Sequence, residues 1–176
     1  MERDKQIILI DIDNCLANHK ERLVKFVNRV LRINIDWKKC TNESERENMR
    51  LKDELYNAIK LIFRISGEKL YLKIMPEAKE FIERHYDNFK ILLWTSRPVH
   101  IHPELKEITE KRLYKNRIKY DHIIYLEGKS KSKAIEDWKN EVDYKKEEYK
   151  IYVIEDLLSS ANEIAEQEID CIFLID

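Results

Sequence analysis

Acidic side chains follow directly after two short apolar runs of this sequence. The run IILI ends at Asp11, and Asp13 lies two residues further on. The run IYVI ends at Glu155, which is followed by Asp156. Carboxylates can act as nucleophiles, exchange protons with a substrate or bind Mg²⁺ through oxygen. The pattern therefore favours carboxylate chemistry supported by a divalent metal.

Hydroxyl and basic side chains follow two further apolar runs. KILLW leads into Thr95, Ser96 and Arg97, and HIIYL is followed shortly by Lys129 and Lys131. Any one of these features could be a helix cap or a turn residue. Four of them in this order, each after an apolar run, favour a shared site. In an open α/β sheet the ligand site lies at the carboxyl ends of the strands.

Phosphoryl transfer through a carboxylate fits this set. Asp11 is predicted to attack phosphorus and form an aspartyl-phosphate. Asp13 is predicted to protonate the leaving oxygen and then to activate water. The anionic substrate repels a carboxylate, so positive charge from Mg²⁺ and a lysine is needed. We assign the metal site to Asp11, Asp13, Asp156 and Glu155, with Glu155 acting directly or through water.

The remaining side chains are assigned to the phosphoryl group. Lys129 is predicted to be the catalytic lysine and is favoured over Lys131, which is assigned to substrate binding. Thr95 and Ser96 would hydrogen-bond the phosphoryl oxygens. Arg97 would orient the substrate, although an arginine before a proline also suits the turn that enters a helix.

The elements that must position these residues can be inferred from the apolar pattern. Five unbroken apolar runs begin near residues 7, 90, 122, 151 and 171, and helical patterns separate the later ones. Continuous rather than alternating apolar strands indicate burial on both faces, as in a parallel sheet covered by helices. The predicted fold class is α/β, with a doubly wound, Rossmann-like sheet.

One segment departs from this alternation. Between residues 17 and 75 the sequence has helical patterns and no convincing strand. Such an insert directly after the first strand would cover the carboxyl edge of the sheet. We predict a catalytic core of residues 1–16 and 76–176 and a helical cap of residues 17–75.

Composition limits the classes of protein that fit. The chain of 176 residues has 33 Lys and Arg against 34 Asp and Glu. Proteins that form stable complexes with nucleic acid normally have an excess of basic residues, so we expect no such complex here. The three cysteines are far apart, which favours reduced thiols over a disulfide framework. No apolar stretch is long enough to cross a bilayer. We therefore expect a cytoplasmic protein with no membrane partner.

The motifs DIDNCLAN, LLWTSRP, a lysine after IIYLEG, and YVIED resemble the four motifs of the haloacid-dehalogenase superfamily. The match extends from Ile7 to Asp176. The resemblance implies a Rossmann-like sheet, a cap after the first motif and a Mg²⁺ cofactor. Asp13 favours phosphatases within the superfamily, because its dehalogenases lack that carboxylate. Motif four is Glu-Asp here rather than the commoner Asp-Asp.

Within the superfamily, TSRP and the run from ITEKRLYKNRIKYD to YVIED resemble the 5′(3′)-deoxyribonucleotidases and related nucleotidases. The resemblance implies a small phosphorylated substrate, most simply a nucleoside monophosphate. A polynucleotide 3′-phosphatase, a sugar-phosphate phosphatase and an inactive protein that binds phosphorylated ligands remain alternatives. Transfer of the phosphoryl group to an acceptor other than water is also open. A lidded domain of this size could form a homodimer through its cap.

Overall fold

The apolar runs of the sequence form the strands of one parallel sheet. The computed structural model describes residues 2–41 and 45–175. The strands are β1 (Gln6–Asp11), β2 (Lys90–Thr95), β3 (His122–Tyr125), β4 (Lys150–Glu155) and β5 (Cys171–Leu174). Their spatial order is β3-β2-β1-β4-β5, with every neighbouring pair parallel. The predicted doubly wound α/β sheet is confirmed.

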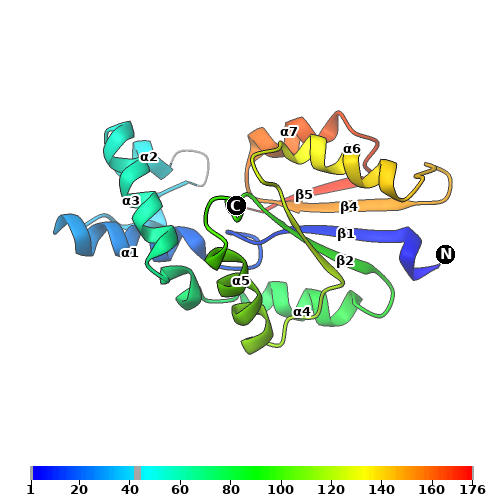
Figure 1. Ribbon diagram of the computed structural model, residues 1–176, viewed down its shortest axis with the longest axis horizontal. Coiled ribbons are helices and arrows are strands. Elements are labelled where there is room, and N and C mark those ends of the chain that lie inside the picture. Colours follow the sequence, from blue (N-terminus) through cyan, green and yellow to red (C-terminus); the bar gives the residue numbers. More distant parts are fainter. Residues whose placement is uncertain (1, 42–44, 176) are drawn as a thin grey trace.

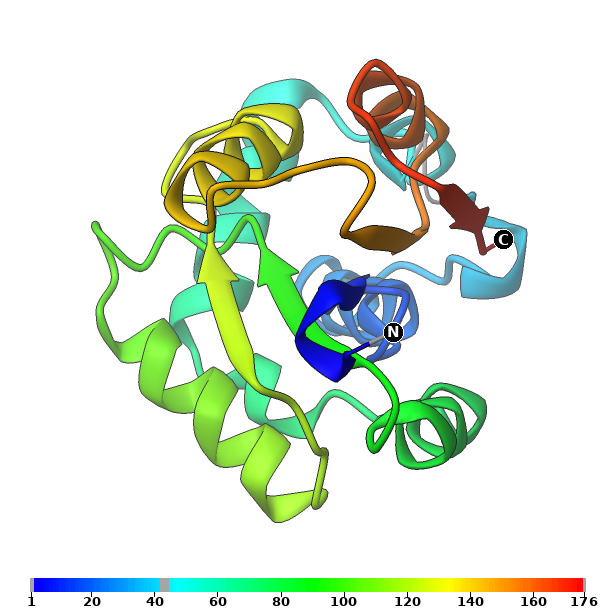
Figure 2. The ribbon, with the colours of Figure 1, turned by 90° about the vertical axis from the view of Figure 1, so that its right-hand side faces the viewer.

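Helices cover both faces of the sheet. Helices α4 (Pro76–His85) and α5 (Glu104–Lys115) pack on one face, while α6 (Lys131–Glu141) and α7 (Leu158–Ala165) pack on the other (Figure 2). Alternate residues of β1 contribute to the two cores, Ile8 and Ile10 to one and Ile7 and Leu9 to the other. These four side chains are at most 3% exposed. Burial on both sides explains why the strand is a continuous apolar run.

Strand β5 departs from this pattern of two buried faces. It lies at the edge of the sheet, and Phe173 and Leu174 are about half exposed, at 52% and 49%. The prediction of a fully buried last strand is therefore wrong at these two positions, because an edge strand has a neighbour on one side only.

The segment between β1 and α4 is built mainly of helices over its described residues. It contains α1 (His19–Leu31), α2 (Glu45–Asn48) and α3 (Asp53–Ile65), with short 3₁₀ turns η2 (Trp37–Lys39) and η3 (Glu68–Tyr71). We call this segment the cap. It lies beyond the carboxyl ends of the strands, on the left of Figure 1. It has a hydrophobic core of its own, in which the ring of Phe63 packs edge-on against Phe26 and His19.

Two backbone hydrogen bonds fasten the cap where the chain enters and leaves it. The amide of Asn18 donates to the carbonyl of Lys73 at 2.9 Å, and the amide of Met75 donates to the carbonyl of Leu16 at 3.0 Å. The segment that enters the cap and the segment that leaves it are therefore held side by side next to the end of β1. This arrangement sets the cap over the residues that follow β1.

Among the residues that the structure describes, no helix is both long enough and apolar enough to traverse a lipid bilayer.

Candidate functional site

Three central strands bring their last residues to one edge of the sheet. Asp11 ends β1, Thr95 ends β2 and Glu155 ends β4. Because β1 lies between β2 and β4 and all three are parallel, these residues meet below the cap. All three are buried, with exposures of 6%, 1% and 0%. The sheet thus supplies a rigid support for polar groups that would be costly to bury singly.

Lys131 is the cation next to Asp11. Its Nζ lies 2.8 Å from Asp11 Oδ1 and 2.5 Å from Glu155 Oε2. Burial raises the pKa of Asp11 to about 6, even though Lys131 opposes that rise. Burial disfavours the ammonium of Lys131, but the two carboxylates outweigh it and hold the pKa of Lys131 above its usual value. Lys131 therefore stays charged beside the predicted nucleophile.

Lys129, which the sequence prediction favoured, does not reach Asp11. Its Nζ lies 2.7 Å from Asp137, and the side chain is 55% exposed. The reason is the local turn: Glu127 and Gly128 have positive φ values, and Ser130 caps α6 by accepting a hydrogen bond from the amide of Lys133. The first helical residue, Lys131, then points into the site. This placement corrects the predicted order of the two lysines.

Asp13 is held by two cations. Arg97 Nη2 lies 2.5 Å from Asp13 Oδ1, and Lys69 from the cap pairs with Oδ2. Burial alone would raise the pKa of Asp13, but Arg97, Lys69 and His19 hold it well below its usual range. Burial and the charge of Arg97 lower the pKa of Lys69. Asp13 is therefore ionised in this arrangement and must exchange partners before it can donate a proton.

The predicted metal ligands separate into two groups. Oxygens of Asp11 and Asp156 lie within 4.8 Å of each other, together with the sulfur of Cys15. The carboxylate of Asp13 faces its two cations, and that of Glu155 accepts from Lys131 and from the amide of Leu157. The structure therefore brings Asp11 and Asp156 together and turns Asp13 and Glu155 toward other partners. This differs from the predicted four-carboxylate set, because buried cations compete for two of its members.

The charges around Asp11 fit a divalent cation. Asp11, Glu155 and Asp156 are buried close together, and Lys131 is the cation that pairs with two of them. Burial and the charge of Asp11 raise the pKa of Asp156 to about 8. Burial also raises the pKa of Cys15, so its thiol remains protonated and is a poor ligand. The available donors are carboxylate oxygens, which suit Mg²⁺.

A cavity of about 170 Å³ connects these groups to the cap. Residues outside the cap line one side of it: Asp11, Asp13, Asn14, Thr95, Ser96, Arg97, Lys131, Asp156 and Leu157. His19, Lys60, Arg64 and Lys69 of the cap line the other side. Thr95 and Ser96 thus lie where the prediction places them. Arg97 reaches the cavity too, but its guanidinium is bound to Asp13 and to the hydroxyl of Thr109.

Several residues of this site were not predicted from the sequence. Asn14 donates to Asp156 Oδ2 at 3.1 Å and accepts from the amide of Lys20 at 2.8 Å, with its own φ at 69°. Asparagine tolerates such a left-handed backbone, so its place in the motif was an available signal. Lys60 and Arg64 are four residues apart in α3, which places both on one face of the helix.

A second arginine, Arg112, is buried like Arg97. Arg112 is 1% exposed, and none of its three guanidinium nitrogens has a hydrogen-bond partner within residues 2–41 and 45–175. Burial and the nearby charge of Arg97 lower the pKa of Arg112 to about 9. The charge of Asp13 opposes this lowering of the Arg112 pKa.

Comparison with solved structures identifies the fold. A haloacid-dehalogenase-like hydrolase from Streptococcus pneumoniae superposes with a TM-score of 0.66 at 13% identity, over 97% of this chain and 84% of that one. A Clostridium acetobutylicum protein described as a "predicted phosphatase" gives 0.64 at 16% identity, over 96% and 83%. The chain has the haloacid-dehalogenase-like fold.

The same fold also includes a protein with another description. Protein Tyrosine Kinase A from Mycobacterium tuberculosis superposes with a TM-score of 0.70 at 10% identity, over 98% of this chain and 84% of that one. No protein-family model and no curated protein sequence matches the chain. Identities this low relate the chain to these structures by fold, so the chemistry must be argued from its own residues.

Proposed function

We propose that this protein is a Mg²⁺-dependent phosphomonoester hydrolase that acts through an aspartyl-phosphate on Asp11. The observation that carries the proposal is the buried group of Asp11, Lys131 and Asp156 at the end of β1, open to the cavity under the cap. The solved structures with this fold include haloacid-dehalogenase-like hydrolases, which supports a phosphatase in particular.

In the first half-reaction a carboxylate oxygen of Asp11 forms a bond to phosphorus, and the bond from phosphorus to the leaving oxygen breaks. Lys131 lies 2.8 Å from Asp11 Oδ1 and would offset the negative charge where Asp11 meets the phosphoryl group. The leaving oxygen takes a proton from Asp13. Asp13 must first release Arg97 or Lys69 and take up a proton from solvent, because both cations now hold it ionised.

In the second half-reaction water attacks the phosphorus of the aspartyl-phosphate while Asp13 accepts its proton, which restores Asp11 and releases inorganic phosphate. Asp11 and Asp156 would hold Mg²⁺, which would supply positive charge to an anionic carboxylate and an anionic phosphate as they approach. Thr95 and Ser96 lie on the cavity wall, where hydroxyl groups can hydrogen-bond phosphoryl oxygens.

The substrate class is the finer part of the proposal. The motif resemblance favours a nucleoside monophosphate, with sugar phosphates and 3′-phosphorylated nucleic-acid ends as alternatives. Transfer to an acceptor other than water uses the same residues, and the kinase-described structure of the same fold gives a reason to test it.

The test measures phosphate release from nucleoside monophosphates, sugar phosphates and a 3′-phosphorylated oligonucleotide, with and without Mg²⁺. Asp11→Asn is the control, since it keeps the side-chain shape and removes the nucleophile. Release that requires Mg²⁺ and is lost in Asp11→Asn is expected. Release that persists in Asp11→Asn would overturn the nucleophile assignment. Product analysis with an added alcohol or nucleoside separates hydrolysis from transfer.

A further inference from the structure

Strand β3 lies at one edge of the sheet and has a strand on one side only. In the described part of the chain it pairs with β2 alone, so alternate residues direct their N–H and C=O groups away from the sheet. Figure 2 shows β3, in yellow-green, as the outermost strand, with α6 above it and α5 below it. Its sequence, HIIY, contains no lysine or proline, which commonly discourage pairing with another chain. This edge can therefore accept a further strand.

A groove of about 500 Å³ follows this edge and includes all four residues of β3. Lys106 and Glu110 of α5 line it on one face of the sheet, and Trp138 and Glu141 of α6 line it on the other. The side chains of an added strand would alternate between these two faces and meet α5 and α6 in turn. The groove shares no lining residue with the cavity under the cap, so it is a separate surface.

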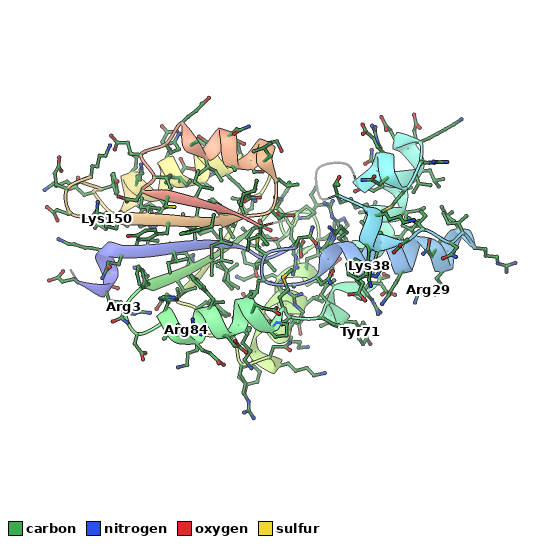
Figure 3. All side chains as sticks on the ribbon, turned by 180° about the vertical axis from the view of Figure 1, so that it is seen from behind. Arg3, Arg29, Lys38, Tyr71, Arg84 and Lys150 are labelled. Atoms are coloured by element: carbon green, nitrogen blue, oxygen red, sulfur yellow. The ribbon has the colours of Figure 1, made fainter. Side chains whose placement is uncertain are left out.

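The charged side chains of the groove are mostly acidic. Five carboxylates and two lysines line it: Glu110, Asp121, Glu127, Asp137 and Glu141, with Lys106 and Lys129. Two of the carboxylates have cations beside them. Arg3, which Figure 3 shows at the end of the core away from the cap, pairs with Asp121 at 2.8 Å, and Lys129 pairs with Asp137 at 2.7 Å.

The other three carboxylates of the groove are not neutralised in this way. The side chains of Glu110, Glu127 and Glu141 have no hydrogen-bond or ion-pair partner within residues 2–41 and 45–175. Glu110 lies on the α5 side and Glu141 on the α6 side, so both faces of an added strand would meet a carboxylate. A surface of one charge sign attracts a ligand of the opposite sign, which here is a cation.

The apolar part of the lining fits a polypeptide rather than a simple cation. Ile124, Tyr125 and Trp138 are only partly buried and line the groove. An extended peptide combines main-chain hydrogen bonds to a strand edge with side-chain contacts on either face. A second copy of this chain would bring the same unneutralised glutamates together, and like charges that face each other across paired strands are destabilising.

We propose that the edge of β3 binds an extended, basic segment of a partner protein by strand addition, and that Glu110 and Glu141 bind its lysine or arginine side chains. The bound segment lies beside β3 as an additional strand of the sheet. This surface is independent of the chemistry at Asp11, so the inference holds whether or not the chain hydrolyses phosphomonoesters.

The first experiment measures binding of labelled heptapeptides by fluorescence anisotropy. The probe is acetyl-VKKVKKV-amide, which presents lysines on both faces of a strand, and acetyl-VEEVEEV-amide is the matched peptide of opposite charge. The basic peptide is expected to bind about tenfold or more tightly than the acidic one, and to bind more weakly as NaCl is added, because salt screens exposed ion pairs.

Two N-methylated forms of the basic peptide test the main-chain contacts. One carries N-methyl groups on its odd-numbered residues and the other on its even-numbered residues. Because the N–H groups of alternate residues face opposite sides of a strand, one pattern should abolish binding and the other should retain it. Bound peptide should also slow hydrogen exchange at alternate amides of β3.

Two double variants assign the binding to this groove. Glu110→Gln with Glu141→Gln keeps the shape of both side chains and removes their charge. Binding of the basic peptide should weaken about fivefold, as the loss of two partly screened ion pairs implies. The matched control, Glu80→Gln with Glu166→Gln, removes two exposed glutamates outside the groove and should leave binding unchanged.

Several outcomes would overturn the inference. These are no binding of the basic peptide, equal binding of the acidic one, or equal effects of the two N-methylation patterns. Unchanged binding in the variant of Glu110 and Glu141 would place the peptide elsewhere on the protein. Slower exchange of the β3 amides when the protein alone is concentrated would identify a second copy as the occupant, and would also overturn the inference.

Discussion

Substitution of Lys131 should impair stability and activity far more than substitution of Lys129, although the two lysines are only two residues apart. The side chain of Lys131 is 7% exposed and pairs with the buried carboxylates of Asp11 and Glu155. Lys129 is 55% exposed and pairs with Asp137. The sequence pattern alone favours Lys129 as the catalytic lysine. Comparing the two substitutions therefore tests whether Lys131 is the lysine that acts beside Asp11.

The expected magnitude follows from burial. Lys131→Met leaves two buried carboxylates without their cation, and removing one partner of a buried pair typically costs about 3–5 kcal/mol of unfolding free energy. We expect a loss in that range at pH 7, together with a fall in kcat of about 10²-fold or more, because the charge at the reacting phosphate is lost. Lys129→Met should change neither quantity measurably, because solvent screens the pair that it removes.

The assay is urea denaturation of wild type and both variants at pH 7 and pH 5, alongside phosphatase turnover. The pKa of Asp11 is about 6, so the carboxyl becomes neutral as the pH falls and no longer needs a counter-charge. The stability deficit of Lys131→Met should therefore shrink at pH 5. Equal destabilisation by the two substitutions, or a larger loss for Lys129→Met, would refute the reasoning.

Three further measurements address other parts of the site. Burial raises the pKa of Asp11 to about 6 and that of Asp156 to about 8. The metal-free folded state therefore binds more protons than the unfolded chain, and its free energy of unfolding falls as the pH rises from about 4 to 8. Mg²⁺ should consequently raise Tm more at pH 8 than at pH 5.5, and Asp156→Asn should abolish that difference; an equal rise at both pH values would contradict the assignment. Arg112→Met should raise the unfolding free energy by about 1–3 kcal/mol in urea titration, because an unpartnered buried charge is replaced by an apolar chain of similar length; a decrease would mean that the guanidinium has an acceptor. Lys69→Met removes one of two cations from Asp13, so the carboxyl titration of Asp13 followed by ¹³C NMR should move to higher pH, and an unmoved titration would show that Arg97 alone sets it.

The sheet and the place of the site could be predicted because both follow from local pattern. A strand buried on two faces must be continuously apolar, and β1 and β4 are. Parallel strands with central β1 then bring Asp11 and Thr95 to one edge, as expected. The half-exposed Phe173 shows where prediction of burial from the apolar pattern fails, because an edge strand has the same local sequence pattern as a central one.

The pairings within the site could not be predicted, because they depend on contacts between residues far apart in the sequence. Asp13 and its cap partner Lys69 are 56 residues apart, and Asp13 and Arg97 are 84 apart. The choice between Lys129 and Lys131 depends on a turn with two positive φ values before α6. A lysine-rich sequence does not specify which lysine points inward from such a turn.

The ion pair between Lys69 and Asp13 limits how freely the two parts of this protein can be recombined. One partner lies in the cap and the other follows β1, so replacing the cap by an unrelated one would remove a buried cation from the core. In such a chimaera Arg97 would be the remaining cation of the two that pair with Asp13. The pKa of Asp13, the proposed acid–base group, would therefore change. Grafting a new cap to change specificity would therefore also require a lysine or arginine at the position of Lys69.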